Sequence, residues 1–253
     1  MAILSTPESV SRFRRNQLKF INKKNVIGNL WDELRGELDR RGFHKKHFDF
    51  LEIGGGSDIF TDRLLECYEN SRAALLDNSR IMIEVNQTNP RKSLILADVD
   101  DLPAVAEGQK YHLIFMNFIL NHCAAGNYFE ALTAQREIIK KALSVLNEDG
   151  RIIVSEILLT GFLGDRICTS MIHRVTSSKL LAPWGQQICA STSGVGLYYL
   201  GENQWPEQFS QCGLTVDRLV KFKRWKVTTF NKILLTMKDI RHGVFVLRRD
   251  RRA

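Results

Sequence analysis

The stretch that most constrains the fold of this chain is Phe48–Phe60, with the sequence FDFLEIGGGSDIF. A run of apolar residues ends at three successive glycines, Gly54, Gly55 and Gly56, and a segment with helical spacing begins near Ile59. This order predicts a buried strand, a tight turn without Cβ atoms and the N-terminus of a helix. Glycines let a ligand approach the backbone closely, and the first turn of a helix presents N–H groups without intrahelical partners. The stretch is therefore a candidate wall of a nucleotide-type pocket.

Further apolar runs follow this turn at regular intervals, with helical segments between them. The runs are Ala73–Leu76, Leu94–Ala97, Leu113–Phe118 and Arg151–Leu159, and the helical segments include Thr61–Glu69 and Tyr128–Leu146. A turn is expected at Asn147–Gly150. Strands that alternate with helices predict an α/β fold with a doubly wound, mostly parallel sheet. Two of the runs end in acids, Asp77 and Asp98, at the sheet edge where such folds bind ligands.

The residues around the glycine turn distinguish two kinds of nucleotide-binding fold. A dinucleotide domain needs glycine at the sixth position of G-x-G-x-x-G, which is Ile59 here, so an NAD-dependent oxidoreductase is disfavoured. Glu52 stands two residues before the first glycine and gives the pattern E-x-G-x-G. This pattern resembles motif I of the class I S-adenosylmethionine-dependent methyltransferases, and the resemblance extends over roughly Asp49–Leu159.

The resemblance implies S-adenosylmethionine as cofactor and S-adenosylhomocysteine as product. In this family the glycine turn lies against the methionine part of the cofactor, and an acid matching Asp77 holds both ribose hydroxyls. An acid matching Asp98 reads the adenine amino group, and the end of the fourth strand, here Asn117, faces the sulfonium. A third glycine is often found where this chain has Asp58. The implied cofactor residues are Glu52, Gly54, Gly55, Gly56, Asp77, Asn78, Asp98, Val99 and Asn117.

The C-terminal part resembles the end of the same fold. Leu214–Trp225 and His242–Arg249 read as strands and match the antiparallel closing pair of the methyltransferase sheet. We therefore expect a Rossmann-like doubly wound sheet, mostly parallel with an antiparallel final strand. Residues 1–47 are expected to form a helical lid or cover, starting near Thr6. Residues 48–253 are expected to form the methyltransferase domain, with a substrate-covering insert at about 160–200.

The acceptor site is harder to predict, because a sulfonium methyl is intrinsically activated and a base is optional. His173 in the insert and His122 after the fourth strand are the candidate general bases, and each is equally compatible with a structural role. If Asp165 lay near His173, it would orient the imidazole. Trp184, Tyr198 and Tyr199 are candidates for the wall of a substrate pocket or for core residues.

Several motifs bear on the kind of acceptor. The fourth strand ends in Asn117-Phe118-Ile119-Leu120, without the Asn/Asp-Pro-Pro-aromatic sequence that positions planar amides and base amines. We therefore expect methylation of an oxygen or nitrogen of a small metabolite. The alternatives are a cofactor-binding protein of this fold that does not methylate, as a partner subunit or non-transfer catalyst, and an RNA methyltransferase.

Composition limits the partners and the compartment. The net charge of +8 is compatible with nucleic acid or with an acidic small molecule, and no appended RNA-binding module is visible. The five cysteines lack C-x-x-C spacing, so we expect neither a metal site nor a disulfide framework. No secretory signal and no apolar run of about 20 residues is present. A cytoplasmic enzyme without a membrane partner is expected, and a homodimer is left open.

Overall fold

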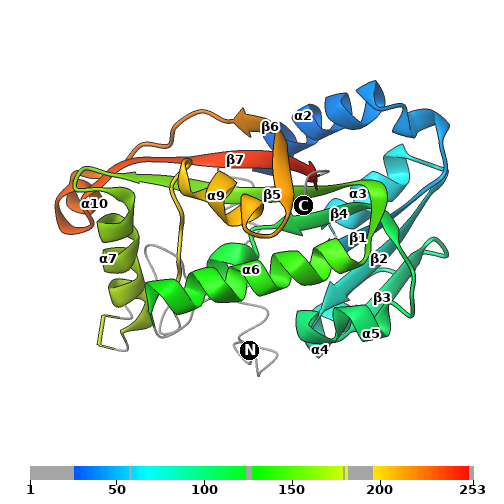
Figure 1. The fold of residues 1–253 in the computed structure, drawn as a ribbon, viewed down its shortest axis with the longest axis horizontal. Coiled ribbons are helices and arrows are strands. Elements are labelled where there is room, and N and C mark those ends of the chain that lie inside the picture. The colour runs from blue at the N-terminus through cyan, green and yellow to red at the C-terminus, as the bar shows by residue number, and fades with distance from the viewer. Residues whose placement is uncertain (1–25, 57–58, 124–126, 179, 182–195, 251–253) are drawn as a thin grey trace. The chain divides into compact units, whose positions relative to one another are not determined.

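The computed structural model describes the chain except for residues 1–25, 57–58, 124–126, 179, 182–195 and 251–253 (Figure 1). Its strands are β1 (Phe48–Ile53), β2 (Ser71–Asp77), β3 (Lys92–Leu96), β4 (Tyr111–Asn117), β5 (Leu146–Gly161), β6 (Leu214–Lys221) and β7 (Met237–Arg249). The α-helices are α2 (Val26–Arg40), α3 (Ile59–Cys67), α4 (Arg80–Glu84), α5 (Leu102–Val105), α6 (Tyr128–Ser144), α7 (Asp165–Ser177), α9 (Gln204–Ser210) and α10 (Thr229–Leu234). Three 3-10 helices are η1 (Phe43–Lys45), η2 (Val99–Asp101) and η3 (Leu120–His122).

The strands form one sheet in the order β3-β2-β1-β4-β5-β7-β6. β1 pairs in parallel with β2 and β4, and β2 pairs in parallel with β3. The backbone that continues β6 runs antiparallel to β7, because Phe222 N–H donates to the His242 carbonyl (3.0 Å) and Trp225 N–H to the Ile240 carbonyl (2.9 Å). The predicted fold class, a mostly parallel doubly wound sheet with an antiparallel end, is confirmed.

The chain divides into two compact units. Unit 1 comprises residues 1–117, 140–154 and 246–249, and unit 2 comprises residues 118–139, 155–245 and 250–253. The division falls within β5 and β7, so each of these strands contributes residues to both units.

Unit 1 places the glycine turn at a reversal of strand order. From β1 the chain adds β2 and β3 on one side and then returns to add β4 on the other side of β1. Apolar residues of β1 and β4 form the core, and the rings of Phe50 and Phe115 pack edge to face with centroids 5.8 Å apart. Trp31, Leu34 and Leu38 of α2, spaced three and four residues apart, are buried. The carboxyl ends of β1 and β4 therefore lie together, where open α/β sheets bind ligands.

The turn predicted at Asn147–Gly150 falls within the range of β5, which begins at Leu146. The backbone folds back on itself there, because a Cβ on Gly150 would lie 3.0 Å from the Asn147 carbonyl oxygen and 2.7 Å from Leu146 Cδ1. Residues three apart in an extended strand are separated by about 10 Å, so the start of β5 contains a sharp bend at the predicted position.

Unit 2 has its own aromatic core. Trp205 and Phe209 of α9 stack with ring centroids 5.5 Å apart, and Phe209 meets Phe245 of β7 at 5.2 Å. All three side chains are fully buried. The expected insert at about 160–200 begins with the helix α7, which buries Cys168, Thr169 and Ile172. The first part of the insert therefore packs as a helix in unit 2.

Candidate cofactor and substrate sites

The glycine turn after β1 adopts a conformation that requires glycine. Gly54 and Gly56 have φ angles of 69° and 56°, in the left-handed region that side chains disfavour. A Cβ on Gly55 would lie 2.6 Å from Leu75 Cγ and 3.3 Å from Glu52 Cδ. The turn is held to the next strand, because Gly54 N–H donates to the Leu76 carbonyl at 2.7 Å. The three residues of this turn therefore carry no side chains, and the hydrogen bond to β2 fixes the position of their backbone.

Asp77, the last residue of β2, connects the glycine turn to the following helix. Its Oδ2 accepts a hydrogen bond from Gly56 N–H (3.0 Å), and its Oδ1 accepts one from Ser79 N–H (2.8 Å). Burial raises the pKa of Asp77, and these two hydrogen bonds oppose the rise. Asn86 holds the other side of the turn, since its Nδ2 donates to the Gly56 carbonyl at 2.9 Å. The predicted acid and the glycine turn are therefore in direct contact.

A second acid lies beyond β3. Asp98 precedes η2, which begins at Val99, and its Oδ1 accepts a hydrogen bond from Asp100 N–H (3.2 Å). Asn78 donates from Nδ2 to Asp98 Oδ2 at 3.1 Å, so the residues that follow β2 and β3 are linked. Burial raises the pKa of Asp98, but the hydrogen bonds from Asn78 and Asp100, together with the positive charge of Lys141, hold the pKa below its usual value. Asp98 is therefore an ionised acceptor at neutral pH.

Glu52 and Asn117 form the third part of the site, at the ends of β1 and β4. Glu52 is buried, and its Oε1 accepts a hydrogen bond from Asn117 Nδ2 at 2.9 Å. Its Oε2 accepts one from the Thr61 hydroxyl of α3. Asn117 Oδ1 is buried and has no hydrogen-bond partner among the described residues. This orphaned oxygen lies at the strand end where the resemblance places the sulfonium of the cofactor.

These residues fit S-adenosylmethionine, the cofactor that the resemblance implies. Gly55 packs against Leu75 and Glu52 of the protein, whereas no described atom lies within 4 Å of the position that a Cβ on Gly56 would take, so a ligand can approach the backbone at Gly56. Carboxylates at successive strand ends can accept hydrogen bonds from hydroxyls and from an amine. Three residues that hold this arrangement were missed by sequence reasoning: Thr61, Ser79 and Asn86. No spacing rule marks them, because their partners lie on other elements.

Unit 2 carries a buried polar network at the turn after β4. Glu156 of β5 accepts a hydrogen bond from Leu120 N–H on Oε1 at 2.8 Å, and Gln135 Nε2 donates to the Leu120 carbonyl at 3.0 Å. The Asn121 carbonyl accepts from Tyr198 N–H at 3.0 Å. Burial raises the pKa of Glu156 to about 8, although hydrogen bonds from Leu120, Asn121 and the Ile157 backbone oppose the rise. The only sequence signal for this network is a charged residue inside the apolar run RIIVSEILL.

Both candidate bases lie in unit 2 and both are neutral at pH 7. Burial lowers the pKa of His122, in η3, to about 4. Burial also lowers the pKa of His173, which lies in α7 and stacks on Tyr198 with ring centroids 4.2 Å apart and an interplanar angle of 17°. A Cβ on Gly196 would lie 2.7 Å from the His173 ring, so this glycine lets the chain pass close to the imidazole. A neutral imidazole can accept a proton.

The proposed orientation of His173 by Asp165 is wrong. The two residues are eight positions apart along α7, a rise of about 12 Å. Asp165 instead accepts a hydrogen bond from Gly161 N–H at 3.0 Å and packs against Gly201. It therefore anchors the start of α7.

The aromatic substrate candidates have different positions. Tyr198 and Tyr199 are buried, and the Tyr199 carbonyl accepts a hydrogen bond from the Thr169 hydroxyl. Tyr198 also meets the ring of Tyr128 edge to face at 6.2 Å. Trp184 lies outside the described residues. In the part of the chain that the structure describes, no group of three His, Cys, Asp or Glu side chains could hold a metal ion.

A family model described as a methyltransferase domain matches residues 44–204 of this chain. The match includes every predicted cofactor residue and both candidate histidines. A curated relative is malonyl-[acyl-carrier protein] O-methyltransferase 1 of Ilyobacter polytropus, 28% identical over 159 residues. The aligned part covers 61% of this chain and 54% of the relative, so the chain spans about half the length of that enzyme.

Solved structures share the fold at low sequence identity. A protein from Galdieria sulphuraria assigned as a sarcosine dimethylglycine methyltransferase has a TM-score of 0.60 at 12% identity, covering 91% of this chain and 88% of that chain. LepI in complex with S-adenosylmethionine has a TM-score of 0.53 at 15% identity, covering 85% of this chain and 46% of that chain. An O-methyltransferase family protein from Burkholderia thailandensis has a TM-score of 0.51 at 13% identity, covering 94% and 62%.

Proposed function

The chain belongs to the methyltransferase-domain family, in the class I fold that uses S-adenosylmethionine, and we propose that it methylates an oxygen or nitrogen atom of a small-molecule metabolite. The observation that carries the proposal is the contact between the glycine turn and Asp77, with Asn78 linking to Asp98 beyond the next strand. The ends of β1, β2 and β3 thus offer a turn without side chains followed by two carboxylates, those of Asp77 and Asp98. A nucleoside with a charged sulfonium side chain needs these acceptors in this order.

The residues of unit 1 would each meet a part of the cofactor. Glu52, held by Asn117 and Thr61, and the glycines would face the methionine moiety. Asp77 would accept hydrogen bonds from the ribose hydroxyls, and Asp98 with Val99 would contact the adenine. When bound, the sulfonium supplies an activated methyl group, so the protein needs only to align the acceptor and exclude water.

For the acceptor, the O-methyltransferase activity in the name of the Ilyobacter relative favours oxygen. A hydroxyl acceptor would profit from a base whose pKa lies near the working pH. His173 and His122 are our candidates, and His122 would be the weaker base, because burial lowers its pKa to about 4. We propose that residues of about 160–200, including Trp184, Tyr198 and Tyr199, hold the acceptor. Residues 1–47 would cover the methyltransferase domain of residues 48–253.

The proposal is tested by calorimetric titration with S-adenosylmethionine and, separately, S-adenosylhomocysteine. We expect binding by the wild type and a rise of about 10- to 100-fold in Kd for Asp77→Ala, because hydrogen bonds to a charged group contribute roughly 1.5–3 kcal/mol. Asp217→Ala, which removes an exposed carboxylate of β6, is the matched control and should bind normally. A folded wild type that binds neither compound would refute the proposal.

A further inference from the structure

Large apolar side chains gather at one end of unit 2. Six of the eleven large hydrophobic residues that are exposed in the described chain come from two short segments, so they are not scattered. The first segment runs from the end of β5 into the first turn of α7, and the second is α10. The six residues are Phe162, Leu163, Ile167, Phe230, Ile233 and Leu234, with Leu163 65% and Ile233 76% exposed. We call them the apolar edge.

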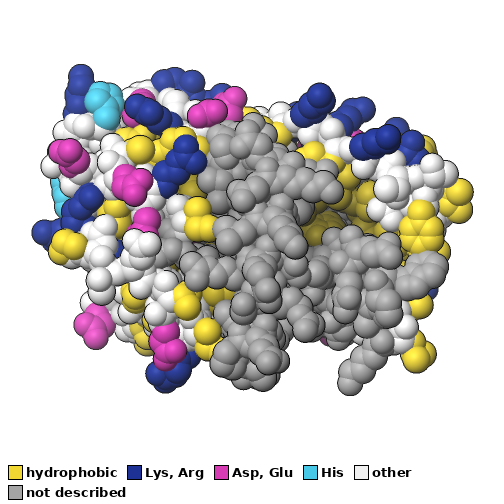
Figure 2. All heavy atoms as spheres, turned by 180° about the vertical axis from the view of Figure 1, so that it is seen from behind, with side chains coloured by type: hydrophobic (Ala, Val, Ile, Leu, Met, Phe, Trp, Pro, Cys, Tyr) yellow, Lys and Arg dark blue, Asp and Glu magenta, His cyan; other side chains and the backbone are white. Residues whose placement is uncertain are grey.

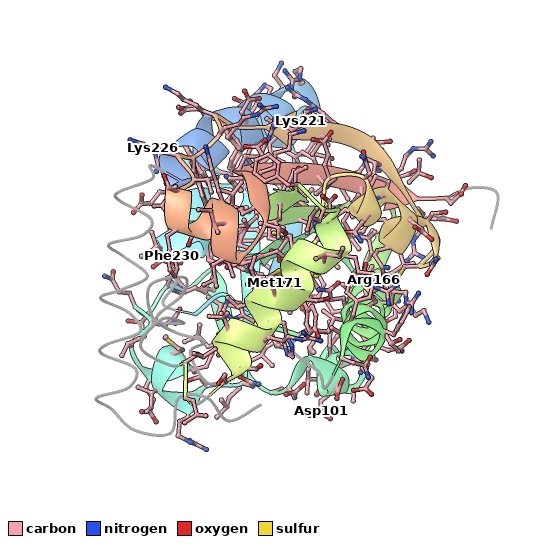
Figure 3. The ribbon with its side chains drawn as sticks, turned by 90° about the vertical axis from the view of Figure 1, so that its left-hand side faces the viewer. Asp101, Arg166, Met171, Lys221, Lys226 and Phe230 are labelled. Carbon is pink, nitrogen blue, oxygen red and sulfur yellow. The ribbon has the colours of Figure 1, made fainter. Side chains whose placement is uncertain are left out.

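The two segments of the apolar edge lie side by side. Phe162 N–H donates to the Thr236 carbonyl at 2.7 Å, which ties the end of β5 to the residues that follow α10. Figure 1 shows α10 beside the start of α7, and in Figure 3 Phe230 of α10 and Arg166 and Met171 of α7 face the viewer. The two segments therefore meet at one end of unit 2.

Helix α10, which carries half of the apolar edge, lies within a basic stretch of unit 2. Residues 218–241 contain eight Lys or Arg and one acid, Asp239, a net charge of +7. Arg224 and Arg241 both pair with Asp239, at 2.9 and 2.5 Å. Four exposed lysines form no ion pair among the described residues: Lys223, Lys226, Lys232 and Lys238. At the right of Figure 2, which shows this end of unit 2 from behind, hydrophobic side chains lie next to a group of Lys and Arg.

We propose that the apolar edge and its lysines bind the surface of an anionic phospholipid membrane. Apolar side chains that project from the tips of two segments can enter the boundary between headgroups and acyl chains, while nearby lysines attract anionic headgroups. A folded acidic partner would need a complementary groove for each projecting side chain, whereas a bilayer accommodates any such set. The excess of positive charge selects an anionic surface over a neutral one.

This proposal revises the expectation that the protein has no membrane partner. That expectation rested on the lack of an apolar run long enough to span a bilayer, and no described helix is long and apolar enough to do so. Surface attachment needs only an exposed apolar edge with basic residues. It also requires neither cofactor binding nor methyl transfer, so its test is independent of the proposed function.

The test is cosedimentation of the full chain with vesicles. We expect binding to equal parts of phosphatidylglycerol and phosphatidylcholine, little binding to phosphatidylcholine alone, and weakening by added salt. The double variant Leu163→Asp with Ile233→Asp should abolish binding. The triple variant Lys223→Glu, Lys226→Glu and Lys232→Glu should weaken it by at least about fivefold per lysine. All five positions are exposed, so the fold should persist, as circular dichroism would verify.

Two control variants lie in unit 1. Lys45→Glu with Lys46→Glu changes exposed lysines, and Leu96→Asp changes an exposed apolar residue; both should bind vesicles normally. The proposal fails if neutral and anionic vesicles bind equally or if the Leu163/Ile233 variant binds like the wild type. It also fails if anionic vesicles do not bind; self-association in ultracentrifugation, or binding to purified acyl carrier protein as the acidic-protein probe, would then identify what the apolar edge contacts.

Discussion

Gly55 is the residue at which the glycine turn admits no side chain. Its neighbours Gly54 and Gly56 need glycine for their backbone angles, but Gly55 needs it for space, because a Cβ would lie 2.6 Å from Leu75 Cγ. Leu75 is fully buried in β2 and can move little. We expect Gly55→Ala to lower the free energy of unfolding by about 1–3 kcal/mol through overpacking, and to weaken S-adenosylmethionine binding. Urea unfolding and calorimetry measure the two effects.

Gly36 is the matched control for this substitution. It lies inside α2, and no atom lies within 4 Å of the position that a Cβ would take. Gly36→Ala should therefore raise the free energy of unfolding by roughly 0.5–1 kcal/mol, since alanine favours helix over glycine. If both variants are equally stable, Leu75 yields to the added methyl group and crowding does not explain Gly55.

At the residue scale, the sequence predicted the residues whose role depends on spacing along the chain. Glu52, Asp77 and Asp98 each stand at or next to a strand end, which an apolar run followed by an acid makes visible. The residues that support them were not predicted, because Thr61 and Asn86 find their partners through the fold. Asp165 shows the opposite error, in which two chemically suitable residues of one helix are too far apart to meet.

At the element scale, the Arg91 side chain links the C-terminal end of α3 to the start of β2 by hydrogen bonds. Its guanidinium donates to the carbonyls of Leu65 (2.6 Å), Tyr68 (3.0 Å), Glu69 (3.0 Å) and Ser71 (3.3 Å). The last carbonyls of a helix have no partner within it, so a fork of N–H donors satisfies groups that would otherwise be left open. We expect Arg91→Ala to lower the free energy of unfolding by about 2–4 kcal/mol in urea titration.

Two variants make the Arg91 experiment specific. Arg91→Lys should recover only part of the loss, because one ammonium cannot reach carbonyls on both sides of a planar fork. Arg72→Ala, which removes an exposed arginine of β2, should change stability by no more than about 0.5 kcal/mol. Full recovery by lysine would show that charge alone matters and would contradict the forked arrangement.

The elements themselves were largely predictable, since long periodic runs identify them. The strands at Phe48–Ile53 and Ser71–Asp77 and the helix at Tyr128–Ser144 agree with their apolar patterns to within a few residues. Asn147–Gly150, whose residue types favour a turn, lies at the start of β5, and the backbone bends there so that Gly150 meets the Asn147 carbonyl oxygen. The inclusion of these residues in β5 is not visible in the local sequence. Helix α7 lacked a clear prediction because its buried face includes Cys168, Thr169 and Thr176.

At the scale of the whole molecule, the alternation of strands and helices in the sequence predicts the parallel sheet. The sequence does not reveal that buried polar groups make the stability of the fold depend on pH. Burial raises the pKa of Glu156 from 4.5 to about 8 in the folded state. The native state therefore holds a proton that the unfolded state releases above pH 4.5. The contribution of Glu156 to stability is greatest below pH 4.5 and is lost as the pH rises to 8, at up to about 1.4 kcal/mol per pH unit.

Glu156→Gln tests this dependence, because an amide keeps an acceptor for Leu120 N–H and cannot ionise. We expect the variant to lose less stability than the wild type between pH 5 and pH 8, measured by urea unfolding across that range. Glu148→Gln, at an exposed position of β5, is the control and should follow the wild type. Parallel curves for wild type and Glu156→Gln would show that Glu156 does not bind a proton on folding.

His242 gives a pH dependence of the opposite sign. It is buried in β7 between Phe222 and Phe118, with ring centroids at 4.7 and 5.0 Å, and neither ring nitrogen has a hydrogen-bond partner among the described residues. Burial lowers its pKa from 6.5 to about 3, so the unfolded state binds a proton that the native state excludes. The contribution of His242 to stability is present above pH 6.5 and is lost as the pH falls toward 3. Burial of His122 likewise lowers stability in acid.

His242→Phe should therefore stabilise the protein in acid, because phenylalanine keeps the stacking on Phe222 and removes the group that must stay unprotonated. We expect its free energy of unfolding to fall less steeply than that of the wild type between pH 6.5 and pH 4, measured by urea unfolding at fixed ionic strength. Glu156 lowers the stability of the fold as the pH rises, and His242 lowers it as the pH falls. A variant carrying both Glu156→Gln and His242→Phe should therefore have the flattest curve of unfolding free energy against pH. A double variant whose curve is as steep as that of the wild type on both sides would mean that neither buried group controls the pH dependence.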